Sequence, residues 1–292
     1  MPSFSLLFNL VLDLASRQRQ VRVPEPELVM TDPDATQAFM RAGREDGILA
    51  FTYLYHAIQA SAVIPAGGRV LDLGCGPANQ LAVIARLNPD AQFTGLDASP
   101  EMLGLADDTL QRCRLHNVTL QEGDMERLAG IDDASLDAVV STITLHHLPD
   151  TAALARCLTE VRRVLKPGGG LYLADFGRLK REATQAFFAN ERSAEQPPLF
   201  TEGYYNSLRA AFSVAELREA ATVLGDAVRM HHTFLVPFLV AIRSRHPHRV
   251  RATTQSAARE VYRELGADQQ RDFRDMVRFF AHGGFPLACR PW

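Results

Sequence analysis

Residues 70–80 read VLDLGCGPANQ, a short apolar run that ends in two closely spaced glycines and leads into a helical segment. Val70 to Leu73 has the continuous apolar character of a strand that is covered on both faces. A ligand can lie against backbone amides only where no Cβ intervenes, so Gly74 and Gly76 allow a close approach. The helix that starts at Gln80 adds partial positive charge at the same place. This stretch therefore predicts a ligand-binding turn at the carboxyl end of a parallel strand.

Four more apolar runs repeat this pattern up to Phe176, with helical stretches between them. The expected strands are Gln92–Asp97, Val118–Asp124, Leu136–Ile143 and Gly170–Phe176. Ser99 followed by Pro100 is typical of a helix start, and another helix is expected from Asp150 to Leu165. Strands that alternate with helices predict βαβ units, a parallel sheet and right-handed crossovers.

The alternation stops after Phe176, and the rest of the chain adds other elements. Residues 178–211 look helical and are interpreted as an insertion that forms a lid over the substrate. A capping box between Ser213 and Glu216 starts the next helix. Two apolar runs, Ala227–Phe234 and Phe238–Arg243, predict a closing hairpin at the sheet edge. A helical tail is expected from about Thr254 to His282.

This organisation divides the chain into three parts. Residues 1–65 form a helical N-terminal appendage, residues 66–245 form the core with the lid insertion at 178–211, and residues 246–292 form a helical C-terminal tail.

Acidic residues stand near the ends of three successive strands. Asp72 precedes the glycine turn, Asp97 ends the second strand and Asp124 ends the third. Each alone could be a helix cap or a turn residue. Together they indicate a nucleoside site, because one carboxylate after the second strand can accept hydrogen bonds from two vicinal ribose hydroxyls. Asp124 is then placed to accept a hydrogen bond from an exocyclic amine.

Five segments in this order resemble the successive motifs of class I S-adenosylmethionine-dependent methyltransferases, over about residues 66 to 245. They are VLDLGCGPANQ (70–80), FTGLDASPEML (93–103), EGDMERL (122–128), LDAVVSTITLHHLPD (136–150) and LKPGGGLYLADF (165–176). The resemblance implies a Rossmann-like α/β fold with helices on both faces of a mostly parallel seven-stranded sheet whose last strand is antiparallel. It also implies S-adenosyl-L-methionine as the cofactor, and methyl transfer as the reaction.

The same resemblance implies a set of cofactor-binding residues. Gly74 and Gly76 would pass near the methionine part, Asp97 would hold the ribose, and Asp124 with Met125 would flank the adenine. The full expected set is Tyr53, Asp72, Gly74, Gly76, Asn79, Asp97, Ala98, Met102, Asp124, Met125, Ser141 and His146.

Two departures bear on this assignment. Ala78 stands where many family members have a third glycine, and its extra methyl group predicts tighter packing. A nucleotide-dependent oxidoreductase would complete G-x-G-x-x-G with a glycine at position 79, where this chain has Asn79. Such an oxidoreductase and a cofactor-binding protein without catalysis are the two alternatives to a methyltransferase.

The sulfonium of the cofactor is already activated, so the protein mainly has to align the acceptor and exclude water. A hydroxyl acceptor or an acidic carbon also needs a general base. The candidates are His146, His147 and Asp175, which lie at the C-terminal ends of the fourth and fifth strands, although each could have a structural role. Tyr55, Arg192, Tyr204 and Tyr205 are the expected substrate-binding residues, the last three of them in the lid.

Composition limits the class of partner. With a net charge of −3, the chain lacks the excess of basic residues that is typical of nucleic-acid-binding proteins. A small molecule or a short peptide is therefore the expected acceptor. The four cysteines lack metal-ligand spacing, and we expect no metal site. The residue pattern leaves open whether oxygen, nitrogen, carbon or sulfur is methylated.

The N-terminal segment Phe4 to Leu14 is apolar, but Asn9 and Asp13 interrupt it and it is shorter than the roughly 20 residues of a membrane span. We expect no membrane association, and interpret the segment as a helix buried against a partner domain or against a second subunit of a homodimer. Nothing at the start resembles a secretory signal, so a cytoplasmic location is expected.

Overall fold

The computed structural model describes residues 4–26, 32–42 and 47–292, and its centre is a seven-stranded sheet. The strands are β1 Arg69–Leu73, β2 Gln92–Asp97, β3 Val118–Glu122, β4 Leu136–Thr142, β5 Leu165–Phe176, β6 Val228–His232 and β7 Leu239–Ser244. Their order across the sheet is β3-β2-β1-β4-β5-β7-β6. β7 is antiparallel to both of its neighbours and the other pairs are parallel, so the expected Rossmann-like α/β class is confirmed.

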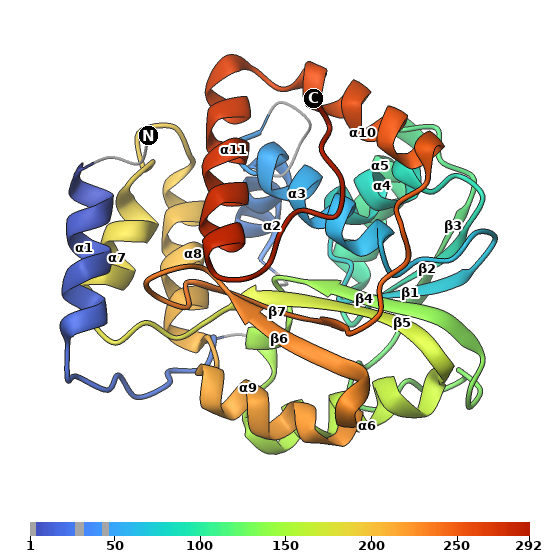
Figure 1. Cartoon of the computed structure of the whole chain (residues 1–292), viewed down its shortest axis with the longest axis horizontal. Coiled ribbons are helices and arrows are strands. Elements are labelled where there is room, and N and C mark those ends of the chain that lie inside the picture. Colours follow the sequence, from blue (N-terminus) through green and yellow to red (C-terminus); the bar gives the residue numbers. More distant parts are fainter. Residues whose placement is uncertain (1–3, 27–31, 43–46) are drawn as a thin grey trace.

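Helices cover both faces of this sheet (Figure 1). On one face lie α3 Ala50–Ser61, α4 Asn79–Leu87, α5 Pro100–Arg112, α10 Ala252–Glu264 and α11 Ala267–His282. On the other lie α6 Thr151–Val164, α9 Val214–Ala220 and the 3-10 helix η2 Ala221–Ala227. Each face has its own core of buried apolar side chains, so the sheet is apolar on both sides as its sequence indicates.

Local capping explains where three of these helices begin. Ser99 accepts a hydrogen bond from the Met102 amide at the start of α5, and the Asp150 side chain accepts one from the Ala153 amide at the start of α6. Ser213 and Glu216 form the reciprocal bonds of a capping box at α9. The predicted helix starts at Ser99, Asp150 and Ser213 are therefore confirmed.

Several predicted boundaries differ from the structure by one or more residues. β3 ends at Glu122, so Asp124 lies in the loop after the strand. β5 begins at Leu165, directly after α6, because Leu165 already pairs with Leu136 of β4, and a register shift separates this pair from the regular pairing that starts at Gly170. The C-terminal tail is two helices, since Leu265 takes an extended conformation and ends α10.

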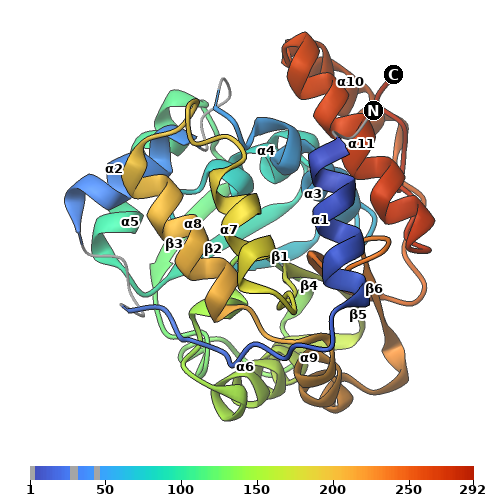
Figure 2. The same ribbon diagram turned by 90° about the vertical axis from the view of Figure 1, so that its left-hand side faces the viewer.

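Three helices lie over the carboxyl ends of the parallel strands (Figure 2). α7 Glu182–Asn190 and α8 Pro198–Ala210 come from the predicted insertion, and α1 Phe4–Ala15 packs against α7. Leu10 of α1 is buried in a small cluster with Leu179 and Val236. The opposite side of α1 exposes apolar residues such as Phe4 and Phe8, so α1 is only partly buried in this chain, and the homodimer contact stays a prediction.

None of the described helices has both the length and the apolar character needed to cross a membrane.

The helix α11 is held to the core by aromatic packing. Phe280 is fully buried, its ring stacks on Tyr55 of α3 with centroids 5.0 Å apart, and it meets Phe285 edge-on at 5.7 Å. Because α11 also forms part of the wall of the cavity described below, this packing positions one side of the site.

We expect Phe280→Ala to lower the free energy of unfolding by about 3–5 kcal/mol, because it removes a fully buried ring and leaves a cavity. Urea denaturation followed by circular dichroism measures the change. Val21→Ala, at a position that is 83% exposed, is the control and should alter stability little. A loss below about 1 kcal/mol for Phe280→Ala would contradict the tight docking of α11.

Candidate functional site

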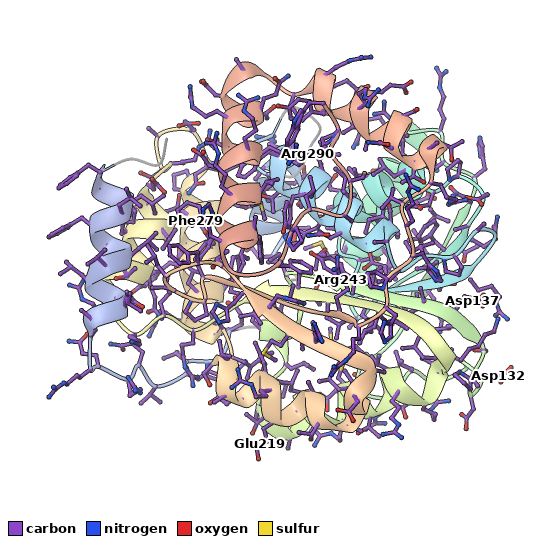
Figure 3. All side chains as sticks on the ribbon, in the orientation of Figure 1. Asp132, Asp137, Glu219, Arg243, Phe279 and Arg290 are labelled. Carbon is purple, nitrogen blue, oxygen red and sulfur yellow. The ribbon has the colours of Figure 1, made fainter. Side chains whose placement is uncertain are left out.

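A cavity of about 1190 Å³ lies at the carboxyl ends of β1, β2 and β4, beneath α7 and α8. Ligand pockets for single drug-sized molecules are about 300–1,000 Å³, so this volume suits two molecules side by side. Side chains from α1 and α11 complete its walls. Figure 3 shows Phe279, one of these wall residues, on the side of α11 that faces α7 and α8.

The glycine turn after β1 forms one wall of this cavity. Gly74 has a φ of +64°, and a Cβ built on it would lie 2.0 Å from Cγ2 of Thr144, so the turn admits no side chain there. The hydroxyl of Thr144 donates to the Gly74 carbonyl at 3.1 Å. Ala78 is fully buried and adopts a φ of +57°, which agrees with the tight packing expected of alanine at this position.

The Asp97 carboxylate connects the first turn with the second. Its Oδ2 accepts a hydrogen bond from the Gly76 amide at 2.8 Å, and its Oδ1 accepts one from the Ser99 amide at 2.9 Å. Burial raises the pKa of Asp97, and the backbone amides that donate to it oppose this rise. The residue also lines the cavity, so its charge faces any ligand bound there.

Asp72 is the second carboxylate at this end of the cavity. It is buried, and its pKa is raised to about 8, first by burial and then by the negative charge of Asp97. Two neighbouring carboxylates in one pocket favour a ligand that carries positive charge.

The structure brings most of the expected cofactor-binding residues together. Those that line the cavity are Tyr53, Asp72, Gly74, Asn79, Asp97, Ala98, Met102, Met125 and His146. Gly76 lies behind this wall and donates to Asp97. Ser141 is fully buried and donates to the Leu73 carbonyl at 2.8 Å, so it joins β4 to β1 instead of facing the cavity.

Asp124 also lies outside the cavity wall, although its neighbours Gly123 and Met125 form part of it. The Asp124 side chain is 53% exposed. Its Oδ2 lies 3.6 Å from Nε of Arg127, and its Oδ1 accepts a hydrogen bond from the Glu126 amide at 2.8 Å. Asp124 thus does not line the cavity in this structure, and its expected adenine contact stays a prediction.

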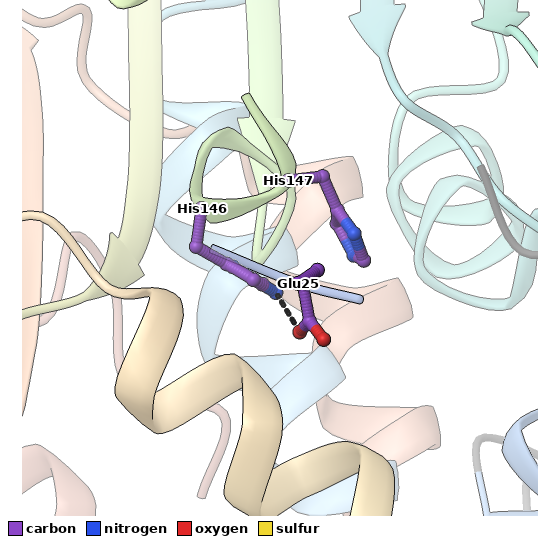
Figure 4. A group of neighbouring side chains, drawn as sticks. All are labelled: Glu25, His146 and His147. Carbon is purple, nitrogen blue, oxygen red and sulfur yellow. Dashed lines mark ion pairs between the residues drawn. The ribbon is translucent and has the colours of Figure 1, made fainter. Parts of the chain in front are cut away.

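A group of ligand-type side chains lies at the same end of the cavity, and we call Glu25, His146 and His147 the polar cluster (Figure 4). Both histidines belong to the short 3-10 helix η1 Leu145–His147, which directly follows Thr144. The His146 Nε2 atom lies 3.8 Å from Oε1 of Glu25. All three residues line the cavity.

The Asp175 carboxylate fixes His146 from behind. Its Oδ1 lies 2.8 Å from Nδ1 of the His146 ring, and its Oδ2 accepts the His146 backbone amide at 2.8 Å. Asp175 is buried and lies outside the cavity wall, so it orients the ring without facing a ligand. Of the three candidate bases, only His146 and His147 face the cavity.

Burial and charge shift the pKa values of this cluster. Burial acts to lower the pKa of His146, but the nearby carboxylates of Asp175 and Glu25 outweigh it and the net pKa is raised. Burial, followed by repulsion from His146, lowers the pKa of His147 to about 3. Burial raises the pKa of Glu25.

Glu25 reaches the site on an extended arm, residues 16–26, that sequence reasoning missed as a functional segment. Arg22 anchors the arm, with its guanidinium 4.0 Å from the Phe212 ring centroid. The same guanidinium donates to four backbone carbonyls, those of His146, Leu148, Pro149 and Ala210. Ser207 of α8 donates to Glu25 Oε1 at 2.8 Å.

Two of the four expected substrate-binding residues line the cavity. Tyr204 contacts Phe176 with ring centroids 5.5 Å apart, within a wall of aromatic side chains. Arg192 also lines the cavity, where its guanidinium pairs with Glu195 at 2.7 Å and Asp272 at 2.9 Å.

The other two lie elsewhere, which corrects the expectation that they contact the acceptor. Tyr55 is fully buried in the core against Phe280, because it lies on the opposite side of α3 from Tyr53. Tyr205 turns away from the cavity and donates its hydroxyl to Glu182 at 3.0 Å.

Most of the remaining cavity wall is apolar. Phe188 of α7 and Phe238 stack with ring centroids 4.0 Å apart, and Phe176 lies 5.8 Å from Phe238. The other apolar lining residues include Leu6, Leu10, Leu199, Phe200, Phe234, Val236, Met276 and Phe279. The cavity thus has a polar end at the glycine turn and η1 and an aromatic wall, while charged side chains such as Glu191, Glu202 and Asp272 line the part beside α7, α8 and α11.

Comparison with known proteins agrees with this architecture. The family model described as "Methyltransferase domain" matches residues 64–220. The chain is 34% identical over 172 residues to the ubiquinone biosynthesis O-methyltransferase of Xanthomonas axonopodis pv. citri, covering 57% of this chain and 67% of that protein. The corresponding protein of Xanthomonas campestris pv. campestris is 33% identical over 179 residues, covering 59% and 70%.

Solved structures show the same fold at low sequence identity. A SAM-dependent methyltransferase from Aquifex aeolicus matches with a TM-score of 0.53 and 18% identity, covering 74% of this chain and 98% of that one. The plantazolicin methyltransferase BpumL, in complex with SAH, matches with a TM-score of 0.53 and 15% identity, covering 82% and 95%. With the five sequence motifs meeting at one cavity and the family model matching more than half of its length, the chain belongs to the methyltransferase domain family and is a class I S-adenosylmethionine-dependent methyltransferase.

Proposed function

We propose that this enzyme transfers the methyl group to a hydroxyl oxygen of a small molecule with a large apolar part. The observation that carries the proposal is that a polar end, with Glu25, His146 and His147, lies in the same cavity as an aromatic wall formed by Phe176, Phe188, Tyr204 and Phe238. The O-methyltransferase names of the relatives support oxygen as the methylated atom.

We propose that the cofactor occupies the part of the cavity beside the glycine turn. When bound, it supplies a methyl group on a positively charged sulfonium, already activated for displacement. Asp72 and Asp97 fit this group, because they are neighbouring buried carboxylates that favour a cation. Asp97 would hold the ribose, and Met125 would lie at the adenine.

The acceptor would lie between this region and the aromatic wall. In the neutral form of His146 with the proton on Nδ1, which bonds to Asp175, Nε2 keeps a lone pair that can receive a hydrogen bond from the acceptor hydroxyl in the cavity. Phe176, Phe238 and Tyr204 would pack on the apolar part of the acceptor and exclude water. This alignment of the hydroxyl oxygen is the main catalytic contribution of the chain.

We expect Asp97→Ala to weaken S-adenosylhomocysteine binding at least about 10-fold, because it removes a charged hydrogen-bond acceptor. Isothermal titration calorimetry measures the affinity. Asp97→Asn keeps one accepting oxygen and should lie between wild type and Asp97→Ala. Asp108→Ala, on the exposed side of α5, is the control and should bind S-adenosylhomocysteine as wild type does. NAD should not bind to the wild-type chain. Unchanged affinity in Asp97→Ala would contradict this placement of the cofactor.

The pKa of Asp72 predicts an unusual dependence of stability on pH. With a folded pKa of about 8 against an unfolded value near 3.9, the native state holds an extra proton between about pH 4 and pH 8. The contribution of Asp72 to the free energy of unfolding therefore falls as the pH rises through this window. Asp72→Asn lacks this loss. We therefore expect its free energy of unfolding, measured by urea denaturation, to rise relative to that of wild type by at least about 1 kcal/mol as the pH goes from about 5 to about 8.5.

Cofactor binding provides an independent readout of the same group. A cation beside Asp72 favours the carboxylate, so S-adenosylmethionine binding at about pH 7 should release a proton. Calorimetry in two buffers of different ionisation enthalpy detects that proton. If Asp72→Asn released the same proton on binding, the cation would not act on Asp72.

For the acceptor, we expect that labelled S-adenosylmethionine and the small-molecule fraction of the source cell yield a methyl ether, identified by mass spectrometry. His146→Gln should reduce the rate at least about 100-fold, because the hydroxyl loses its partner, while S-adenosylhomocysteine affinity stays within about threefold. His116→Gln, at an exposed histidine, is the matched control. A product methylated on nitrogen, carbon or sulfur, or full activity of His146→Gln, would contradict the proposal.

A further inference from the structure

The polar cluster brings together three side chains that are common ligands of transition metals. One ligand atom each from Glu25, His146 and His147 lies within 4.8 Å of the other two. Exposed acidic groups often lie this close without function, but here the His146 side chain is 1% exposed and that of Glu25 is 8% exposed. Burial of a carboxylate beside two imidazoles needs a compensating group.

Two ring nitrogens in this cluster are buried without a hydrogen-bond partner among the described residues. They are Nε2 of His146 and Nδ1 of His147. Nearly all buried polar atoms in folded proteins are satisfied, so two adjacent exceptions at the wall of one cavity require an explanation. A ligand that accepts electron pairs from nitrogen would satisfy both atoms.

The surroundings hold these groups in the orientation that a metal ion requires. Asp175 bonds to Nδ1 of His146, and this arrangement of carboxylate, histidine and metal commonly fixes a ligating ring with its other nitrogen free. Ser207 donates a hydrogen bond to the Glu25 carboxylate. Arg22, on the same arm as Glu25, donates to the backbone carbonyl of His146, so hydrogen bonds hold the arm next to η1. The site is thus supported by hydrogen bonds that do not use the free nitrogens.

We propose that Glu25, His146 and His147 bind a divalent transition metal ion of the zinc type. Two imidazoles and one carboxylate are a typical protein ligand set for catalytic zinc, with the remaining position left open. Two ligand atoms on one tetrahedral zinc ion are about 3.4 Å apart, given bonds of about 2.1 Å. The 3.8 Å between His146 Nε2 and Glu25 Oε1 is close to this, and the ligand atom of His147 lies within 4.8 Å of the ligand atoms of both.

All three ligands line the cavity, and this gives the ion a role that rests on the proposed function: the ion would take the Nε2 lone pair of His146, and the acceptor hydroxyl would bind the ion in place of the ring. With the ion bound, a hydroxyl on it would lose its proton to solvent water more readily, because the ion would stabilise the oxyanion. The acceptor oxygen then forms a bond with the methyl carbon while the carbon–sulfur bond breaks, and the electron pair of that bond stays on sulfur. The metal is neither oxidised nor reduced.

A proton is the competing explanation for the same geometry. If His146 is protonated, it forms a long ion pair with Glu25 at 3.8 Å, and no metal is needed. That arrangement leaves Nδ1 of His147 without a partner among the described residues, whereas a metal ion uses both histidines.

Metal binding can be measured without any acceptor. The full chain, stripped with a chelator, is titrated with Zn²⁺ by calorimetry, and Co²⁺ is added separately to record its visible absorption. We expect one site per chain, and a loss of affinity of at least about 100-fold in Glu25→Gln and in His147→Gln, each of which removes one of three protein ligands. Glu202→Gln, which alters another cavity carboxylate, and His116→Gln are the matched controls and should bind as wild type does.

Two checks accompany the titration. Each variant should keep its S-adenosylhomocysteine affinity, which shows that the core remains folded. The Co²⁺ spectrum should lack the near-ultraviolet bands of thiolate ligands, because Cys75 also lines the cavity.

No Zn²⁺ binding by the wild-type chain, equal binding by Glu25→Gln and His147→Gln, or a thiolate spectrum would each overturn the metal site. Methyl transfer at full rate in excess chelator would overturn the role of the metal and leave the proposed acceptor class intact. A product other than a methyl ether, with the metal bound as expected, would overturn the acceptor class and leave the metal site intact.

Discussion

The hydrogen bonds of the Asp97 carboxylate are the constraint on which the rest of the site depends. By accepting the amides of Gly76 and Ser99, one side chain holds the turns after β1 and β2 in a fixed relation. Thr144 extends this connection to the turn after β4 through its contact with Gly74. Three turns that are distant in sequence thereby form one rigid rim, and η1 with both histidines follows directly from it.

Features that depend on local sequence were predictable. Strands covered on both faces show as apolar runs, and the helix starts at Ser99 and Ser213 show as capping residues, so the order of elements follows from the sequence alone. Asp72 and Asp97 reach the cavity because side chains near the carboxyl ends of parallel strands share one edge of the sheet. The same reasoning predicts that Ser141 of β4 faces the cavity, but its side chain is fully buried and donates a hydrogen bond to the neighbouring strand β1.

Helical geometry explains the mixed result for the tyrosines. Two residues along a helix are rotated by about 200°, so Tyr53 and Tyr55 of α3 cannot face the same surface. Consecutive residues differ by about 100°, which separates Tyr204 in the cavity from Tyr205 at Glu182. Which of two aromatic residues faces the ligand depends on how the helix packs, and the residue pattern alone does not determine that.

The arm that carries Glu25 could not be recognised from sequence for a different reason. It is extended, has no periodic pattern, and its anchor Arg22 bonds to backbone carbonyls, which any residue type can supply. The polar cluster is therefore divided between two parts of the chain: the histidines lie within residues 64–220, which the family model matches, and Glu25 lies on the arm before them. A substitution confined to the arm, residues 16–26, would then alter the polar cluster without changing any residue of the three turns after β1, β2 and β4.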